Sequence, residues 1–157
     1  MSNLNFCSTL AIKLFMSLFF YRKFSKLSRK LGRAPEVRQL FHGTSEDSVA
    51  AICQQGFDWR LCGAHGTAYG KGSYFAVNAS YSDGYAKTSQ GHKKMFLAKV
   101  IVGTYVVGNG STVRPPPRNP VNPYELHNAC VDKQQNPTIF VIFENDQVYP
   151  ELLITYS

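Results

Sequence analysis

The amino-acid sequence predicts an α+β domain with helices in the first third of the chain and strands mainly in the second half. Apolar residues recur every three or four positions across residues 16–31, as one face of a helix requires. From residue 73 onward, short runs rich in β-branched and aromatic residues indicate strands. With 157 residues, of which 44% are hydrophobic, the chain can form one domain with a single core.

The predicted helices alternate apolar and basic positions or carry clear end signals. Gly32 and Pro35 end the first helix, whose basic side chains face solvent. Ser45 can cap the second helix, and Gly56 should end it. The predicted helices are residues 16–31 and 46–55, and the predicted strands are residues 37–41, 73–77, 94–102, 105–107, 138–143 and 152–156.

Two segments of the second half differ sharply in their expected role. Residues 139–143 form an unbroken apolar run, which is typical of a central strand covered on both faces. Between residues 108 and 123, five prolines should prevent regular strand pairing. We therefore expect a central strand at 139–143 and a surface excursion at 108–123.

The net charge of +7 comes from the N-terminal part of the chain. Residues 1–40 hold eight basic residues against Glu36 alone, whereas nine basic and nine acidic residues balance from residue 41 onward. Such a segment can contact nucleic acid or an acidic membrane surface, but the solvated face of an amphipathic helix is the commoner explanation.

The cysteines and the hydropathy of the chain indicate its redox compartment and whether it binds a metal or enters a membrane. The four cysteines form no C-x-x-C pair, which favours reduced thiols in the cytoplasm or nucleus. Cys62 and His65 offer two metal donors, fewer than a tetrahedral site needs, so we expect no metal. The apolar run at residues 10–21 is interrupted by Lys13 and Ser17 and is shorter than the roughly 20 residues of a membrane span. We expect no membrane insertion.

A glycine-containing loop precedes the strand at residues 73–77. Gly66, Gly70 and Gly72 allow a close backbone approach to a ligand, although their spacing fits neither a P-loop nor a dinucleotide fingerprint. A turn or two of helix after the strand would bring Tyr85 opposite Tyr74 across a slot for a planar ring. Each stack would contribute about 1 kcal/mol. Alternatively, these tyrosines are core or rim aromatics.

These motifs together resemble the catalytic domain of the poly(ADP-ribose) polymerase (PARP) family. The matching motifs are His42-Gly43-Thr44, the segment from Tyr69 to Ala76, Tyr81-Ser82, Tyr85, and the segment from Pro137 to Phe143. Their order and spacing match from about residue 16 to the C-terminus, and residues 52–60 and 148–151 most resemble the branch whose longer members carry CCCH zinc fingers and a WWE domain. Residues 1–15 do not match, so we expect an atypical N-terminal segment there, a catalytic domain at 16–157, and a fold shortened at its N-terminus.

The resemblance implies a split antiparallel β-sheet ADP-ribosyltransferase fold with flanking helices. It also implies NAD⁺ as co-substrate, protein side chains as acceptors, including those of the enzyme itself, and release of nicotinamide. The implied cofactor-binding residues are His42, Gly43, Thr44, Tyr74, Phe75, Ala76, Tyr81, Ser82 and Tyr85. By position, His42 would bond the adenosine ribose, Gly43 and Ser82 would hold the carboxamide, and Tyr74 and Tyr85 would sandwich the nicotinamide ring.

The same resemblance implies further roles on the donor side and the kind of product that forms. Thr44 would support the ribose or adenine side, and residues 57–69 would close over the donor. The implied catalytic triad is His42, Tyr74 and Ile139. Chain-elongating members carry Glu at the position of Ile139, and isoleucine has no acceptor atom. We therefore expect transfer of single ADP-ribose units. The alternatives are a catalytically weak or inactive NAD⁺ or ADP-ribose binding module and a nucleic-acid-binding scaffold.

Overall fold

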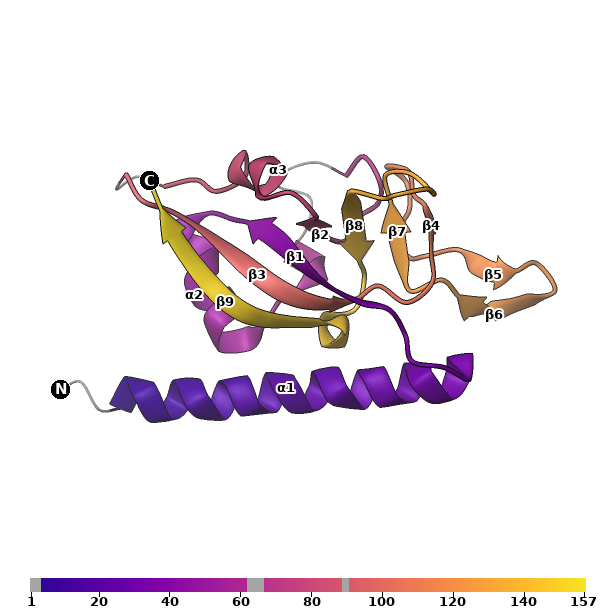
Figure 1. Ribbon diagram of the computed structural model, residues 1–157, viewed down its shortest axis with the longest axis horizontal. Coiled ribbons are helices and arrows are strands. Elements are labelled where there is room, and N and C mark those ends of the chain that lie inside the picture. The colour runs from indigo at the N-terminus through magenta and orange to yellow at the C-terminus, as the bar shows by residue number, and fades with distance from the viewer. Residues whose placement is uncertain (1–3, 62–66, 89–90) are drawn as a thin grey trace.

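The computed structural model describes residues 4–61, 67–88 and 91–157. Within them the chain forms a seven-stranded sheet, a separate two-stranded hairpin and helices that pack on the sheet (Figure 1). The helices are α1 (Leu4–Leu31), α2 (Glu46–Gln55) and α3 (Ala79–Asp83), with 3-10 turns η1 (Trp59–Leu61) and η2 (Asn145–Gln147). The strands are β1 (Val37–Gly43), β2 (Ser73–Ala76), β3 (Lys93–Ile101), β4 (Tyr105–Val107), β5 (Pro117–Asn119), β6 (Asn122–Leu126), β7 (Ala129–Val131), β8 (Ile139–Ile142) and β9 (Val148–Tyr156).

The large sheet is divided between β1 and β2. Its strand order is β4-β7-β8-β2-β1-β3-β9, and every neighbouring pair is antiparallel except β4 with β7. β1 pairs with β3 along its whole length, from Val37 to Gly43, but its register with β2 contains the single pair Phe41↔Ala76. The two groups of strands therefore diverge beyond this pair, and the predicted α+β class with a split, mainly antiparallel sheet is confirmed.

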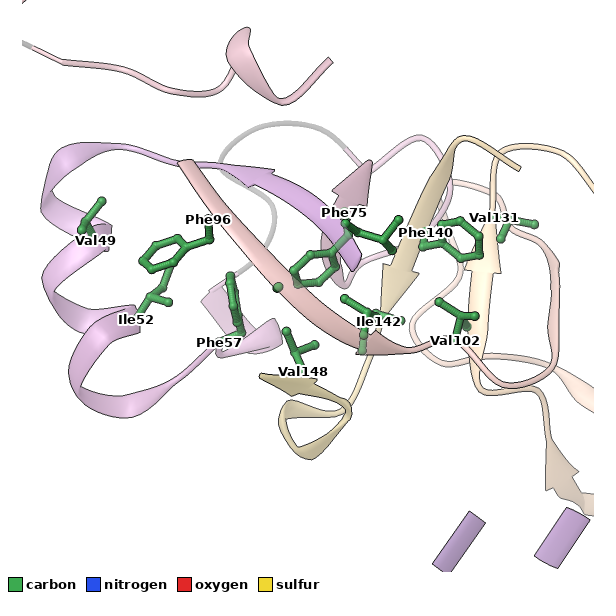
Figure 2. Close-up of a cluster of buried hydrophobic side chains, with 14 residues drawn as sticks. Val49, Ile52, Phe57, Phe75, Phe96, Val102, Val131, Phe140, Ile142 and Val148 are labelled. Carbon is green, nitrogen blue, oxygen red and sulfur yellow. The ribbon is translucent and has the colours of Figure 1, made fainter. Parts of the chain in front are cut away.

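The main hydrophobic core lies between α2 and one face of the sheet. Val49 and Ile52 of α2 approach Phe96 of β3 and Phe57, which follows α2 (Figure 2). Four buried aromatic side chains, together with aliphatic residues of the sheet, continue the cluster toward β8 and β7. The aromatic members are Phe57, Phe75, Phe96 and Phe140. β8 is buried at every position and lies inside the sheet, as predicted for a central strand.

α1 packs on the sheet through a second, smaller cluster. Phe20 and Leu27 are buried against Ile101 of β3, and Tyr149 of β9 packs beside them. Lys23 also forms an ion pair with Glu144. Across the described residues, no helix combines the length and apolar character needed to cross a bilayer. The C-terminal half of α1 shows the predicted amphipathic pattern, while nucleic-acid contact through its basic side chains stays the less favoured, untested alternative.

The predicted start of the first helix, at residue 16, was wrong. The helix begins at Leu4, because residues 4–15 contain neither glycine nor proline and extend a helix that the docked half has already nucleated. The helix therefore crosses the predicted boundary between segments 1–15 and 16–157, and that division stays a prediction.

The proline-rich segment also differs from the prediction, because it contains the hairpin of β5 and β6. Pro117 pairs with Leu126 and Asn119 with Asn122. Each strand of an isolated hairpin leaves one edge unpaired, so proline costs no ladder bond when its missing N–H would face that edge. The Asn119 side chain accepts a hydrogen bond from the Val121 amide at 2.9 Å and supports the turn. Figure 1 shows the hairpin projecting away from the large sheet.

Two features of the strands were missed. β7 contains only Ala-Cys-Val, which is too short to stand out in a pattern, yet it lies between β4 and β8. β9 starts at Val148 rather than at residue 152, and its register with β3 shifts between Leu97 and Ala98. Pro150 lies on this edge strand, where a missing amide proton is tolerated.

Candidate active site

A cleft opens where β1 and β2 diverge. Its walls come from the end of β1, from β2, from α3 and from the side of α2 that faces them, and they enclose a cavity of about 200 Å³. Every residue of the predicted cofactor-binding set lines it, namely His42, Gly43, Thr44, Tyr74, Phe75, Ala76, Tyr81, Ser82 and Tyr85. The structure thus brings these sequence-distant residues together, while their roles toward NAD⁺ stay predictions.

The imidazole of His42 is held as a neutral ring with a defined tautomer. Its Nδ1 lies 2.7 Å from the carbonyl oxygen of Tyr74, and since a carbonyl only accepts, Nδ1 carries the proton and Nε2 is an acceptor. The ring packs edge-on against Phe57 at 4.9 Å between centroids and lies 5.3 Å from Phe75. Burial lowers the pKa of His42 to about 4 and outweighs the opposing effect of the bond to Tyr74.

Gly43 and Ser82 bring β1 and α3 into direct backbone contact. A Cβ atom at Gly43 would lie 1.8 Å from the carbonyl oxygen of Ser82, so only glycine permits this approach. The buried Ser82 hydroxyl donates a hydrogen bond to the Phe41 carbonyl at 3.1 Å. Its oxygen can still accept a hydrogen bond from an amide N–H group.

The phenol of Tyr74 is fixed by the glycine loop that precedes β2. Its hydroxyl donates to the Gly70 carbonyl and accepts from the Tyr69 amide, each at 2.9 Å. Gly70 has a φ of +134°, and a Cβ atom at Gly72 would lie 2.6 Å from the Ile142 carbonyl oxygen. Glycines at these positions therefore let the loop pack tightly on β8 and hold the tyrosine. Gly66, the third glycine of the predicted loop, lies outside the described residues.

Two further tyrosines stand one helical turn apart on and after α3. The hydroxyl oxygens of Tyr81 and Tyr85 are 3.2 Å apart, and their ring centroids are separated by 5.5 Å. Burial, followed by the hydrogen bond to Tyr85, raises the pKa of Tyr81, so its phenol stays neutral. Tyr85 and Tyr74 line the same cleft, as the predicted slot requires, and a stacked ring between them stays a prediction.

Ile139 is not among the described residues that line this cleft. It begins β8, pairs with Ala76, and lines a neighbouring hollow with Asn78, Ser80, Tyr81 and Thr138. Because Tyr81 belongs to both walls, the hollow adjoins the cleft.

Asp132 holds the start of β8 in place. It accepts hydrogen bonds from the Thr138 hydroxyl at 2.6 Å and from the Ile139 amide at 3.1 Å. Partial burial alone would raise the pKa of this carboxyl, but the hydrogen bonds from Thr138 and Ile139 outweigh it and lower the pKa. Asp132 was missed in the sequence because its partners lie across a turn.

The model of the family described as "Poly(ADP-ribose) polymerase catalytic domain" matches residues 19–157. The chain belongs to this family.

Several relatives of the PARP catalytic domain align with most of the chain. "Protein mono-ADP-ribosyltransferase PARP12" of Mus musculus is 55% identical over 126 residues, which cover 80% of this chain and 18% of that protein. "Protein mono-ADP-ribosyltransferase PARP11" of Homo sapiens is 40% identical over 160 residues, covering 88% of this chain and 47% of that protein. "Protein mono-ADP-ribosyltransferase PARP14" of Homo sapiens is 40% identical over 140 residues, covering 87% and 8% respectively. The chain thus spans less than half the length of each of these relatives.

One wall of the cleft in this PARP domain was missed by the sequence interpretation. It comes from α2, whose residues Ser48, Ala51, Ile52 and Gln55 line the cavity. Their spacing of three, one and three follows a single helix face, which is the signal that marks this wall.

The predicted closing segment, residues 57–69, is only partly described. Phe57, Asp58 and Leu61 line the cleft, whereas Cys62 and His65 lie outside the described residues. In the part of the chain that the structure describes, no three His, Cys, Asp or Glu side chains gather closely enough to hold a metal ion.

Proposed function

We propose that this domain is an NAD⁺-dependent mono-ADP-ribosyltransferase that transfers one ADP-ribose unit to a protein side chain and releases nicotinamide. The observation that carries the proposal is the convergence in one cleft of a neutral histidine, the Gly43–Ser82 backbone contact and the tyrosines 74 and 85. Relatives at 40–55% identity are named as enzymes of this activity, which supports the same conclusion.

Gly43 and Ser82 suit the carboxamide of nicotinamide. The Gly43 backbone offers an amide donor and a carbonyl acceptor, and no side chain stands in the way. Because the Ser82 hydroxyl proton is engaged with Phe41, its oxygen can accept from the carboxamide N–H. The flat faces of Tyr74 and Tyr85 would then hold the ring by stacking, each contributing about 1 kcal/mol.

His42 suits the adenosine ribose because its Nε2 can accept a hydrogen bond from a ribose hydroxyl. In the reaction, the bond between nicotinamide nitrogen and ribose C1′ breaks, its electron pair leaves with the neutral nicotinamide, and positive charge develops on the nicotinamide ribose. A charged imidazole in the cleft would oppose that charge. The pKa of about 4 keeps His42 neutral and removes this repulsion.

The acceptor side of the site favours a single transfer. The hollow beside Tyr81 is lined by uncharged residues, among them Ile139. Isoleucine can neither orient a ribose hydroxyl nor activate an incoming sugar hydroxyl. The acceptor side chain must therefore be nucleophilic enough to attack C1′ without activation by residue 139, and it loses its proton to its surroundings. An ADP-ribose that is already attached finds no carboxylate at this position to activate its hydroxyl for elongation.

Acceptor proteins, including the enzyme itself, and a reducing compartment are part of the same proposal. Cys53 and Cys130 are free thiols, and Cys130 is fully buried. Free thiols fit the cytoplasm or nucleus, where disulfides are rare.

Incubation with labelled NAD⁺, followed by mass determination of the adduct, tests the proposal. We expect one ADP-ribose per modified side chain on the protein itself or on an added acceptor. Tyr74→Ala should abolish the label and His42→Ala should reduce it. Tyr124→Ala, at an exposed tyrosine of the hairpin, serves as the control that keeps activity. Stabilisation by NAD⁺ without any label would leave a binding module, and neither label nor stabilisation of the folded protein would refute the proposal.

A further inference from the structure

A polar cluster outside the cleft joins three elements at one carboxylate. Asp83 is the last residue of α3, Lys93 the first of β3 and Tyr156 the last of β9. The Lys93 ammonium donates to both carboxylate oxygens of Asp83 at 3.0 Å, and the Tyr156 hydroxyl donates to one of them at 2.8 Å. Lys93 and Tyr156 face each other in the register of β3 with β9, so the two donors are themselves held together.

α3 depends on such contacts because it is short. A helix of five residues is not stable alone and takes its position from what it packs against. On one side it is fixed by the backbone contact between Gly43 and Ser82 and by the hydrogen bond from Ser82 to Phe41. Asp83 supplies the attachment to β3 and β9, which the first set of contacts does not reach.

We propose that Asp83, Lys93 and Tyr156 are positioning residues that set the place of α3, and through it that of Ser82 and Tyr85. Asp83 directly follows Ser82 in the chain and precedes Tyr85 by two positions, so a shift of its carboxylate moves both residues. None of the three lies among the described residues that line the cleft, and they act on it only through α3.

The charges of the cluster suit this role at neutral pH. Hydrogen bonds from Lys93 and Tyr156 lower the pKa of Asp83, which is therefore ionised. Burial, and then the bond to Asp83, raises the pKa of Tyr156 to about 12, which keeps its hydroxyl proton in place as a donor. Both donors face an anionic acceptor, the stronger kind of hydrogen bond.

A second cluster on the same strands provides a matched control. The carboxylate of Glu151 on β9 accepts from Lys99 of β3 at 2.7 Å and from Gln39 of β1 at 2.6 Å. Like Asp83 it joins one lysine and one neutral donor at a partly exposed site, but its partners do not include α3. Neutralising Glu151 therefore shows how loss of a comparable ion pair changes the stability of the fold without a direct effect on α3.

The test compares Asp83→Asn and Tyr156→Phe with Glu151→Gln. The first measurement is amide hydrogen exchange of the ligand-free protein at residues 79–86. In this segment the Tyr85 amide donates a hydrogen bond to the Ser82 carbonyl, and the Ala86 amide donates one to the Asp83 carbonyl. The second is the Kd for NAD⁺ with the Tm of each variant. We expect both test variants to speed exchange in this segment and to raise the Kd about three- to fivefold, the range set by a partly exposed pair. Glu151→Gln should change neither, while its Tm falls by a similar amount.

Substitution of the lysine sharpens the result. Lys93→Arg keeps the charge and should retain most of the wild-type affinity, whereas Lys93→Gln should behave like Asp83→Asn. The inference is overturned if the test variants alter exchange at residues 79–86 no more than Glu151→Gln does.

The effect on affinity rests on the proposed function, and the two failures can be told apart. If the folded wild-type protein binds no NAD⁺, the proposed function falls, and the exchange measurement still decides whether the cluster positions α3.

Discussion

The neutral state of His42 illustrates how a single side chain takes its chemistry from its surroundings. The ring packs against Phe57 and Phe75 and donates through Nδ1 to a backbone carbonyl. Desolvation penalises the charged form, and the hydrogen bond compensates only in part. An acceptor nitrogen is thereby available throughout the physiological range of pH.

This environment predicts a distinct pH dependence. The unfolded chain protonates His42 near pH 6.5, but the folded chain does so only near pH 4, so stability falls as the pH is lowered through this window. Affinity for NAD⁺ should stay flat from pH 8 to 6 and fall only near pH 4. Denaturation curves of wild type and His42→Gln across this range provide the measurement. The same loss of stability in the variant would exclude His42 as its source.

Gly43 provides a second prediction at the residue scale. A methyl group at this position meets the backbone of Ser82, which can move aside only if α3 shifts. Gly43→Ala should therefore weaken NAD⁺ binding about tenfold or more, since relieving such overlap costs about 1–3 kcal/mol. Gly84→Ala is the matched control, because its Cβ would be 3.6 Å from the nearest atom and its φ is −59°. Calorimetric titration with NAD⁺ compares the two, and equal affinities would contradict the expectation.

Under the proposed function, we expect Ile139 to affect the product rather than donor binding. Ile139→Glu places a carboxylate at a site that is 7% exposed, so stability should drop by about 2–4 kcal/mol. Long polymers should not appear, because none of the described residues that line the adjoining hollow carries a charge to bind a second ADP-ribose. Gel analysis of the products, with denaturation of the same variant, measures both effects. The appearance of long chains would show that the residue at 139 alone sets product length.

At the scale of elements, α1 shows how burial varies along one helix. Phe20 and Leu27 are buried on the sheet, whereas Leu14 and Leu18 are exposed. Among the described side chains of α1, a few residues therefore account for its docking on the sheet.

A pair of leucine substitutions on α1 tests this unequal anchoring. Leu27→Ala should cost about 2–4 kcal/mol, as is usual for a buried leucine. Leu14→Ala, at a side chain 72% exposed, should stay within about 0.5 kcal/mol of wild type. Urea denaturation monitored by circular dichroism gives both values. Similar losses for the two variants would mean that Leu14 is buried in solution.

For the molecule as a whole, local patterns predicted the elements better than their pairing. The helix at 46–55 and the central strand at 139–143 were predicted correctly because a helix face or an apolar run is written in consecutive residues. β7 was missed because three residues form no recognisable pattern and the strand is stabilised by its pairing with β4 and β8. The hairpin of β5 and β6 pairs neighbouring residues, and it was missed because its prolines argued against a strand.

The candidate site divides in the same way. The family resemblance indicated which residues would converge, and every residue of the predicted cofactor-binding set lines the cleft. The contact of Gly43 with Ser82 and the cluster at Asp83 depend on distances between segments, which residue spacing does not contain. The depressed pKa of His42 likewise follows from packing by Phe57 and Phe75, which no local motif encodes.

The strand order has a consequence for synthesis of the protein. β3 pairs with β9 and β2 pairs with β8, so these earlier strands cannot complete their pairing until residues near the C-terminus have been synthesised. While the ribosome still holds the last residues, the hydrogen-bonding edges of β2 and β3 lack these partners and are open to chaperones or to misassembly. A nascent chain stalled before residue 139 should therefore be unable to retain the co-substrate, even though almost every wall of its cavity has already been made.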